Sequence, residues 1–370
     1  MRLLIIMGTR PEAIKFAPLI KQLEKEHSFE LRICITGQHK EMLQQVLDFF
    51  EITPHYDLNL MKHNQTLFDV SAGALTGLKP ILDEYRPDIV FVQGDTTTAF
   101  IGALAAFYEK CKIAHLEAGL RSGDKFSPFP EEANRKLTGA IADFHFAPTE
   151  LAKNALLKEN ILDNVWVVGN TVVDALLLGL ENLRNRAIDF KEEFEYINFT
   201  KPVILITAHR RESFGKPFED ICDAILDIKN THPEVQFIYP VHFNPNVREV
   251  VNRKLAGIEG IFLIEPLDYP RLIWLMEKST IILTDSGGIQ EEAPALGKPV
   301  LVMRDVTERI EGIDAGTAKL VGTEKEVIVS NLHALLKNSD GIYDKMAKAV
   351  NPYGDGTTSK QIIDILKSLK

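Results

Sequence analysis

Short apolar runs alternate with longer amphipathic stretches along most of the chain. Residues 3–7, 89–92 and 280–283 are rich in Ile, Leu and Val, and each run is followed by a polar turn that contains glycine and then by a stretch with helical spacing. Continuous apolar runs are typical of parallel strands that are covered on both faces. The alternation of strand and helix therefore predicts an α/β protein built on parallel sheets.

Two such series follow one another in the 370 residues, a length that favours two domains over one. The first series continues to Gly169, and the second begins after residues 182–201, which are charged and poorly periodic. We therefore predict two Rossmann-like, doubly wound domains, residues 1–169 and residues 170–353, followed by a terminal helix at about 354–370.

Composition excludes several classes of protein. Hydrophobic residues make up 45% and charged residues 25%, which is typical of a globular protein, and the formal net charge is −10. A nucleic-acid partner is not expected because such proteins usually carry a basic face. No apolar run is long enough to span a membrane, and Cys34, Cys111 and Cys222 lack disulfide or zinc spacing. We expect a cytoplasmic protein that does not bind a membrane.

The most suggestive turn follows residues 280–283. Ser286, Gly287 and Gly288 open a helix there, so unblocked backbone N–H groups and the positive end of the helix dipole point to one place. This arrangement suits a phosphate. Glu292, about one turn further on, suits the hydroxyls of a sugar. The alternative is an ordinary strand–helix turn with Ser286 as its N-cap.

Two cations, Arg10 and Lys15, lie at the start of the helix that follows the first strand, where acidic residues are usually favoured. A bound polyanion would explain their position. Simple solvation of both side chains is the alternative.

Three acids follow strands or begin helices in the first half: Asp95, Glu117 and Glu131. Ligands of open parallel sheets bind outside the carboxyl ends of the strands, so these acids are candidates for proton transfer. If they lie together, repulsion should raise the pKa of at least one. The alternatives are a helix cap for Asp95 and an ion pair within one helix between Glu131 and Arg135.

His209 follows a strand of the second half and precedes Arg210 and Arg211, so it could steady or protonate a leaving phosphate, although a lone His is more often structural. Other chemistries lack their motifs. There is no dinucleotide-binding glycine motif after the first strand, no P-loop and no paired His spacing for zinc. Neither a nicotinamide cofactor nor a metal is expected.

Several segments together resemble the non-hydrolysing UDP-N-acetylglucosamine 2-epimerases of bacteria, over nearly the whole chain and in the same order. They are 8–12 (GTRPE), 93–96 (QGDT), 115–121 (HLEAGLR), 130–135 (PEEANR), 209–213 (HRRES), 285–292 (DSGGIQEE) and 307–309 (TER). The resemblance implies the glycosyltransferase-B architecture with an active site in the cleft between the domains, and a C-terminal helix that returns to the first domain.

The resemblance also implies a reaction: UDP-GlcNAc is converted to UDP-ManNAc, without a cofactor, by elimination and re-addition of UDP through 2-acetamidoglucal. Asp95, Glu117 and Glu131 would be the acid–base residues and His209 would assist UDP. The residues implied for substrate binding are Arg10, Lys15, Arg135, Ser286, Gly287, Gly288, Glu292 (on the ribose) and Arg309.

Members of this family often bind a second UDP-GlcNAc as an activator, for which Gln38, Glu132, Arg211 and His242 are candidate contacts, and a homodimer is expected. One departure from the pattern is Ile310, where Pro usually follows the Arg, so the stiffness of that loop is in question. The alternatives are a hydrolysing relative that releases ManNAc and UDP, a glycosyltransferase on the same architecture, and a non-catalytic sensor of UDP-sugars.

Overall fold

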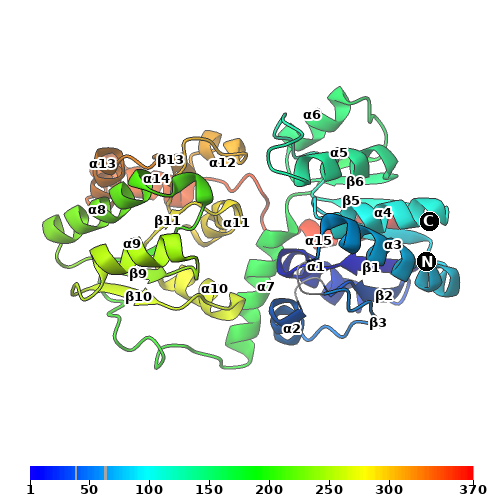
Figure 1. Ribbon diagram of the computed structural model, residues 1–370, viewed down its shortest axis with the longest axis horizontal. Helices are drawn as coiled ribbons and strands as arrows, with labels where there is room; N and C mark the ends of the chain where they lie inside the picture. Colours follow the sequence, from blue (N-terminus) through cyan, green and yellow to red (C-terminus); the bar gives the residue numbers. More distant parts are fainter. Residues whose placement is uncertain (38–39, 62–64, 370) are drawn as a thin grey trace. The chain divides into compact units, whose positions relative to one another are not determined.

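The computed structural model describes residues 1–37, 40–61 and 65–369 (Figure 1). The chain forms two compact units: unit 1 is Met1–Leu178 with Tyr353–Lys370, and unit 2 is Gly179–Pro352. The division falls inside α7 (Thr171–Asn185), whereas the predicted junction at residue 169 lies just before this helix. The last helix, α15 (Thr358–Ser368), belongs to unit 1 and packs against α1 (Arg10–Leu23).

The described part of unit 1 contains a parallel sheet of seven strands in the order β3-β2-β1-β4-β5-β6-β7. Both of its faces are covered. Leu4 and Ile6 of β1 pack in the core that includes helix residues Leu78 and Ala103, and their neighbour Ile5, on the opposite face, is equally buried. The strands are β1 (Arg2–Met7), β2 (Glu30–Ile35), β3 (Tyr56–Asp57), β4 (Ile89–Gln93), β5 (Lys112–Leu116), β6 (Phe144–Ala147) and β7 (Val165–Val167).

Helices connect these strands and cover the sheet. The chain turns into α1 directly after β1, with Thr9 and Glu12 forming a capping box and Pro11 in the first turn. The other helices that lie wholly in unit 1 are α2 (Lys40–Phe49), α3 (Leu67–Tyr85), α4 (Thr97–Tyr108), α5 (Glu131–Ile141) and α6 (Glu150–Lys158).

Unit 2 repeats the plan. Its parallel sheet has six strands in the described residues, in the order β10-β9-β8-β11-β12-β13. Ile204 and Ile206 of the central strand pack in a core with Phe218 and Ile225 of the following helix. The strands are β8 (Val203–Thr207), β9 (Gln236–Pro240), β10 (Ile261–Ile264), β11 (Ile281–Thr284), β12 (Val300–Val302) and β13 (Ala318–Leu320).

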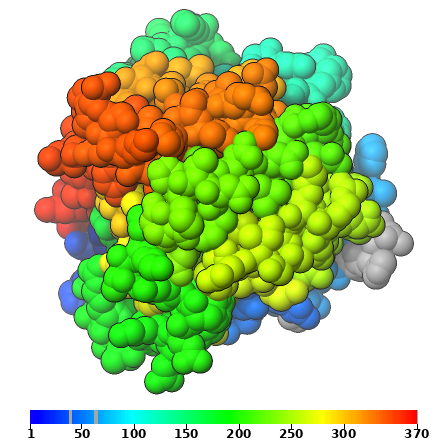
Figure 2. All heavy atoms as spheres, turned by 90° about the vertical axis from the view of Figure 1, so that its left-hand side faces the viewer, coloured from blue at the N-terminus to red at the C-terminus, as the bar shows by residue number. Residues whose placement is uncertain are grey.

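The helices of unit 2 are α8 (Lys216–Thr231), α9 (Pro245–Leu255), α10 (Tyr269–Lys278), α11 (Gly287–Glu292), α12 (Ile310–Asp314), α13 (Lys325–Leu336) and α14 (Ile342–Lys348). Figure 2 shows a face of this unit on which α8 lies between α9 and α13, both of which it contacts. The helix that opens at residues 286–288 is short. It is α-helical only to Glu292 and continues as a 3₁₀ turn, Ala293–Leu296, where Pro294 has no N–H for a helical bond.

Strand order locates the binding edge of each sheet. In unit 1 the order reverses between β1 and β4, and in unit 2 it reverses between β8 and β11. Ligands of doubly wound sheets bind at such a switch point, outside the carboxyl ends of the strands. The turns at these points carry Arg10 and Asp95 in unit 1, and His209 and Ser286 in unit 2. The predicted fold class of two Rossmann-like domains is thus confirmed.

Candidate functional site

Glu117 is held in an unusual backbone conformation at the end of β5. Its φ is +59°, in the left-handed region that residues with a side chain rarely adopt. Its carboxylate accepts hydrogen bonds from Lys15 Nζ at 2.5 Å, from Asn170 Nδ2 at 3.3 Å and from the side-chain amide of Gln93. Only 6% of the side chain is exposed. Such a strained, fully engaged acid at a strand end is typical of a functional residue.

Asp95 and Arg135, both predicted site residues, form an ion pair. Arg135 Nη2 lies 2.5 Å from Asp95 Oδ2, and its Nη1 lies 3.3 Å from Glu132 Oε2. Asn134, the neighbour of Arg135 on α5, donates its side-chain N–H to the backbone oxygen of Asp95 at 2.9 Å. The start of α5 is thereby fastened to the turn that follows β4. The alternative pairing of Arg135 with Glu131 inside the helix is not formed.

Glu131 begins α5 beside this pair, and its Oε2 atom is buried without a hydrogen-bond partner in the described structure. A buried carboxylate oxygen that lacks a partner is costly, and a hydroxyl or N–H group of a ligand would satisfy it. Glu131 is therefore placed to contact a bound molecule.

Glu12 is the carboxyl in this region whose pKa is raised, although the sequence suggested only an ordinary first-turn residue. Burial raises its pKa, against the lowering effect of hydrogen bonds from Thr96, Thr9 and the backbone of Gly8. The Thr96 hydroxyl donates at 2.7 Å, so Glu12 ties the turn after β1 to the turn after β4. The prediction that one of Asp95, Glu117 and Glu131 has a raised pKa stays a prediction.

Arg10 opens α1 at the same edge. Its side chain has no hydrogen bond or ion pair with the rest of the described chain, in contrast to Lys15, which binds Glu117. An uncompensated cation at a helix N-terminus is suited to an anionic ligand.

In unit 2, Asp285 organises the turn that follows β8. Its Oδ2 accepts the backbone N–H groups of His209 at 2.6 Å and of Arg210 at 2.7 Å. Its Oδ1 lies 3.2 Å from His209 Nδ1, without the geometry of a hydrogen bond, so we treat this contact as electrostatic. Burial alone would raise the pKa of Asp285, but His209 and the two backbone donors lower it. Asp285 therefore carries a negative charge beside the His209 ring.

The rest of this turn offers donors. His209 is 42% exposed, and its ring stacks on that of His242 with centroids 5.3 Å apart. The Nε atom of Arg210 is buried without a partner in the described structure. These groups lie at the switch point of the sheet, as an anion site requires.

Ser286, Gly287 and Gly288 start α11 on the neighbouring strand, β11. A Cβ at Gly287 would lie 3.2 Å from Cζ of Arg309, so glycine permits the guanidinium to approach the helix start. Arg309 is held by Glu291, 2.9 Å away, and by Glu308, 2.8 Å away. Burial would raise the pKa of Glu308, but Arg309 and Arg304 lower it to about 2.

Glu292 points back toward Gly288, with its Oε2 3.9 Å from the position that a Cβ there would occupy. It is buried and accepts the hydroxyl of Tyr269 at 3.1 Å. Burial and the Glu292 carboxylate raise the pKa of Tyr269, which keeps the phenol protonated as the donor. Glu292 is thus oriented by an internal donor at the start of α11.

The candidate contacts for a second nucleotide sugar lie in different settings. Glu132 is fully buried, where it accepts the backbone N–H groups of Ser122 and Gly123 and pairs with Arg135. Arg211 is exposed in a 3₁₀ turn, and His242 stacks on His209. Gln38 lies outside the described residues. An activator site at these residues stays a prediction.

The sequence was compared with known protein families and with individual proteins. The sequence profile described as UDP-N-acetylglucosamine 2-epimerase matches residues 21–367. A UDP-N-acetylglucosamine 2-epimerase of Escherichia coli is 52% identical over 375 aligned residues, covering 100% of this chain and 99% of that protein. The chain belongs to the UDP-N-acetylglucosamine 2-epimerase family.

Two solved structures of this epimerase family extend the comparison. The enzyme from Neisseria meningitidis, determined with UDP-GlcNAc bound, is 49% identical, and the match covers 100% of both chains with a TM-score of 0.92. The enzyme from Methanocaldococcus jannaschii, in complex with UDP-GlcNAc and UDP, is 36% identical with a TM-score of 0.80, again with 100% of both chains covered.

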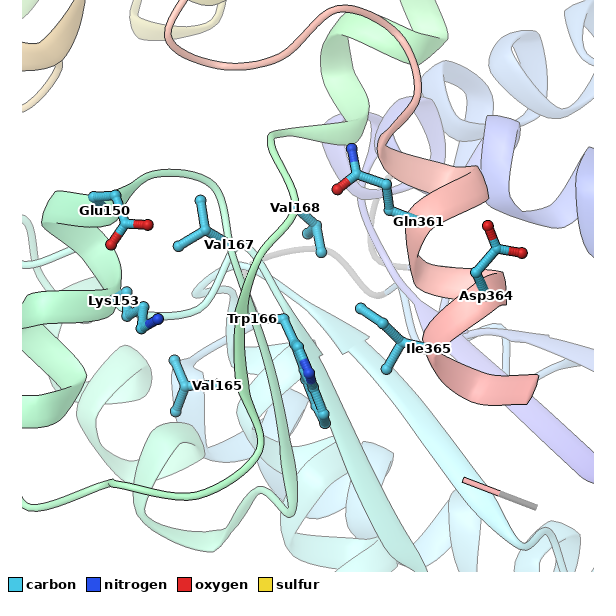
Figure 3. Close-up of a pocket in the computed structure, with 9 residues that line it drawn as sticks. All are labelled: Glu150, Lys153, Val165, Trp166, Val167, Val168, Gln361, Asp364 and Ile365. Atoms are coloured by element: carbon cyan, nitrogen blue, oxygen red, sulfur yellow. The ribbon is translucent and has the colours of Figure 1, made fainter. Parts of the chain in front are cut away.

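Two hollows lie away from the predicted residues of this epimerase. One hollow of about 470 Å³ in unit 1 lies between α6, β7 and α15, and its walls are drawn in Figure 3. Another, of about 420 Å³ in unit 2, lies beside Trp274. A small space of about 10 Å³, near the volume needed for one water, adjoins Glu117 and Asn170. We therefore locate the site by strand ends and contacts rather than by cavity size.

Two further observations concern the described residues, 1–37, 40–61 and 65–369. No group of three or more His, Cys, Asp or Glu side chains among them could hold a metal ion. None of their helices is both long and apolar enough to cross a bilayer.

Proposed function

We propose that this protein interconverts UDP-GlcNAc and UDP-ManNAc by eliminating and re-adding UDP. Membership in the epimerase family supports the overall activity. The observation that carries the mechanism is Glu117, an acid held at a strand end in a strained backbone conformation and oriented by Lys15 and neighbouring amides. A protein that only binds a nucleotide sugar gains nothing from acids placed in this way beside a diphosphate.

The chemistry requires two changes at neighbouring carbons. The bond between C1 and the diphosphate oxygen breaks, UDP leaves with the electron pair, and the proton at C2 passes to a carboxylate, which leaves the C1=C2 double bond of 2-acetamidoglucal. UDP then adds back at C1, and a proton returns to the opposite face of C2. Because the C2 proton is not acidic, the bond to the diphosphate must break before the proton is removed. The enzyme can therefore accelerate the reaction most by stabilising the negative charge on the departing diphosphate.

We assign the proton transfers to unit 1. Asp95, Glu117 and Glu131 are the acid–base residues. Asp95 pairs with Arg135 and Glu117 pairs with Lys15, so a cation holds each of these two acids in position. Glu131, whose Oε2 lacks a partner, can exchange a hydrogen bond or a proton with the sugar.

We assign UDP to the donors of unit 2, with Arg10 of unit 1 as a further cation. The hydroxyl of Ser286, the backbone N–H groups of Gly287 and Gly288 and the buried Nε of Arg210 suit the diphosphate, and Glu292 suits the ribose. The backbone N–H of Ser286 itself donates to Thr284 Oγ1 at 2.9 Å. Arg309 adds positive charge beside Gly287, and His209, supported by Asp285, stabilises UDP as it leaves.

Solvent deuterium tests the mechanism. The protein is incubated with UDP-GlcNAc in D₂O, and the products are followed by NMR. We expect UDP-ManNAc at equilibrium, with deuterium at C2 of both sugars. Added UDP should speed the exchange, because it returns bound 2-acetamidoglucal to the nucleotide sugars. Free ManNAc and UDP alone would instead identify a hydrolysing enzyme, and a lack of exchange with transfer of the sugar to an acceptor would identify a glycosyltransferase.

A second UDP-GlcNAc as activator and a homodimer also remain predictions from the family resemblance. Both are tested directly, the first by the dependence of the reverse reaction on added UDP-GlcNAc and the second by light scattering.

A further inference from the structure

Asn170 occupies the point where the chain leaves the sheet of unit 1 and enters α7. Its Oδ1 accepts the backbone N–H of Val172 at 3.1 Å, so the side chain caps this helix. Because the oxygen is used in this way, the amide nitrogen is the atom that points toward Glu117, and its distance to Oε1 of Glu117 is 3.3 Å. The orientation of the amide is therefore fixed by two independent contacts.

The same residue also touches the segment by which the chain returns to unit 1. The backbone N–H of Asn170 donates to the carbonyl oxygen of Tyr353 at 2.7 Å. Tyr353 is the first residue of unit 1 after unit 2. Gly169 permits this approach: its φ is +91°, and a Cβ there would lie 3.0 Å from the same carbonyl oxygen. Asn170 is thus anchored through its backbone and cannot easily move away from Glu117.

We propose that Asn170 is a positioning residue for Glu117, which it orients by a hydrogen bond that only an amide donor can supply. The inference rests on the function proposed above. Lys15 and Gln93 approach the Oε2 atom of Glu117, whereas Asn170 approaches Oε1. The amide of Asn170 therefore holds the other oxygen of the carboxylate. Contacts on both oxygens fix the plane of the carboxylate, and so the direction from which it can approach the sugar.

The variant Asn170→Asp separates this role from helix capping. Aspartate caps a helix as well as asparagine does, so the contact with Val172 is retained. The donor facing Glu117, however, becomes an acceptor that carries negative charge, and the two carboxylates repel. We expect deuterium exchange at C2, counted per folded molecule, to fall about 10- to 100-fold, with little change in the affinity for UDP. The same repulsion should lower the melting temperature at neutral pH.

Asn170→Ser provides a second variant, since serine also caps helices but is too short to reach Glu117. It should lower exchange less than Asn170→Asp because it removes the hydrogen bond without adding a charge. Full exchange activity in both variants would show that Asn170 only caps α7, and would overturn the proposal.

Asp174 provides the matched control at the same crossing. It accepts the backbone N–H of Ser359 at 2.7 Å and of Thr358 at 3.3 Å, which fastens α7 to the start of α15, and it forms no hydrogen bond with Glu117. Asp174→Asn should change the melting temperature without lowering exchange per folded molecule. An equal loss of exchange in Asp174→Asn and Asn170→Asp would assign the effect to the anchoring of α15, and would also overturn the proposal.

A direct measurement on the carboxylate keeps the test independent of activity. The Glu117 carboxyl carbon is assigned in protein labelled with [5-¹³C]glutamate, with Glu117→Gln as the reference, and its titration is followed by NMR. Lys15 of α1 pairs with this carboxylate, His115 of β5 interacts with it electrostatically, and both are unchanged in the variants. We expect a higher midpoint in Asn170→Asp. An unchanged midpoint would refute the contact, whereas absence of exchange in the unaltered protein would refute only the proposed function.

Discussion

Six strands of the sheet in unit 1 follow the same order as the six of unit 2, but the two sheets carry opposite chemistry at the carboxyl ends of their strands. In unit 1 the turns after β4 and β5 present acids, Asp95 and Glu117, each paired with a cation. In unit 2 the equivalent acid, Asp285, turns inward and holds backbone N–H groups, and the outward groups are a histidine and arginines. The comparison teaches that the fold determines where a ligand binds, while the side chains at the strand ends determine what happens to it.

The ion pairs of the two units also differ in which partner we assign to function, the acid in unit 1 and the cation in unit 2. In unit 1, Lys15 and Arg135 neutralise acids that we assign to proton transfer. In unit 2, Glu291 and Glu308 hold Arg309, a cation that we assign to UDP. If this division is correct, substitutions in unit 1 should impair proton exchange, and substitutions in unit 2 should impair the binding of UDP.

The largest effect is expected for the acids of unit 1. Glu117→Gln preserves size but cannot accept a proton, so deuterium exchange at C2 should fall about 10²- to 10⁴-fold. Calorimetry should show nearly unchanged affinity for UDP. A parallel loss of UDP affinity would instead assign Glu117 to binding and would remove the contrast between the units.

A smaller effect is expected for the helix start in unit 2. Gly287→Ala introduces a Cβ that would lie 3.2 Å from Cζ of Arg309, and displacement of this guanidinium should weaken UDP binding about tenfold. The elimination step measured at saturating substrate should change less. Gly288→Ala is the control: its Cβ would lie 3.9 Å from its nearest neighbour, so it adds a methyl group at the helix start without displacing Arg309. Equal losses in both variants would show that Arg309 is not the cause.

The smallest effect concerns stability in acid, and it belongs to unit 1. His115 and His145 face each other in register on β5 and β6. Burial lowers the pKa of His115 to about 3 and that of His145 to about 4. The unfolded chain binds protons near pH 6.5, whereas the folded chain does not, so stability should fall as the pH drops below 6.5 and level off near pH 3 to 4. At pH 5 each histidine should cost about 2 kcal/mol.

Chemical denaturation at pH 7 and pH 5 measures this loss, and His145→Gln should reduce the difference between the two values. Glu12 and Asp174 act with the opposite sign, because burial raises the pKa of both carboxyls and folding then binds protons. Comparing the variant with the unaltered protein cancels their contribution. The same pH dependence in both proteins would contradict the assignment.

Much of the fold could be predicted because both faces of each sheet are covered. The strands of both sheet centres are continuous apolar runs, and the expected runs 89–92 and 280–283 correspond to β4 and β11. The edge strands β3 and β13 were missed. Tyr56–Asp57 and Ala318–Leu320 are too short, and too polar or exposed, for a periodic pattern. Helix α9 was missed because its apolar residues are sparse among charged ones.

The predicted site residues were found from strand ends, but their partners were not. A strand–turn–helix pattern indicates that Glu117 lies at an edge, yet it cannot show that Lys15, 102 residues earlier, reaches it. Glu12 looks like an ordinary first-turn acid, and only the fold brings Thr96 to it. Asp285 had the same signal as Asp95, an acid directly after a strand, and could have been chosen by that rule. To predict contacts between distant turns, one must know the order of the strands in the sheet, and the sequence pattern does not give that order.

The left-handed backbone at Glu117 sets stability against function at a single position. Glycine adopts this conformation without strain, so replacing Glu117 by glycine should relieve about 1 kcal/mol of backbone strain, but it also leaves Lys15 without its carboxylate. A substitution that relieved the strain and replaced Lys15 together would be rewarded by selection for heat resistance alone, so thermostable variants of this protein should be screened for turnover before they are kept.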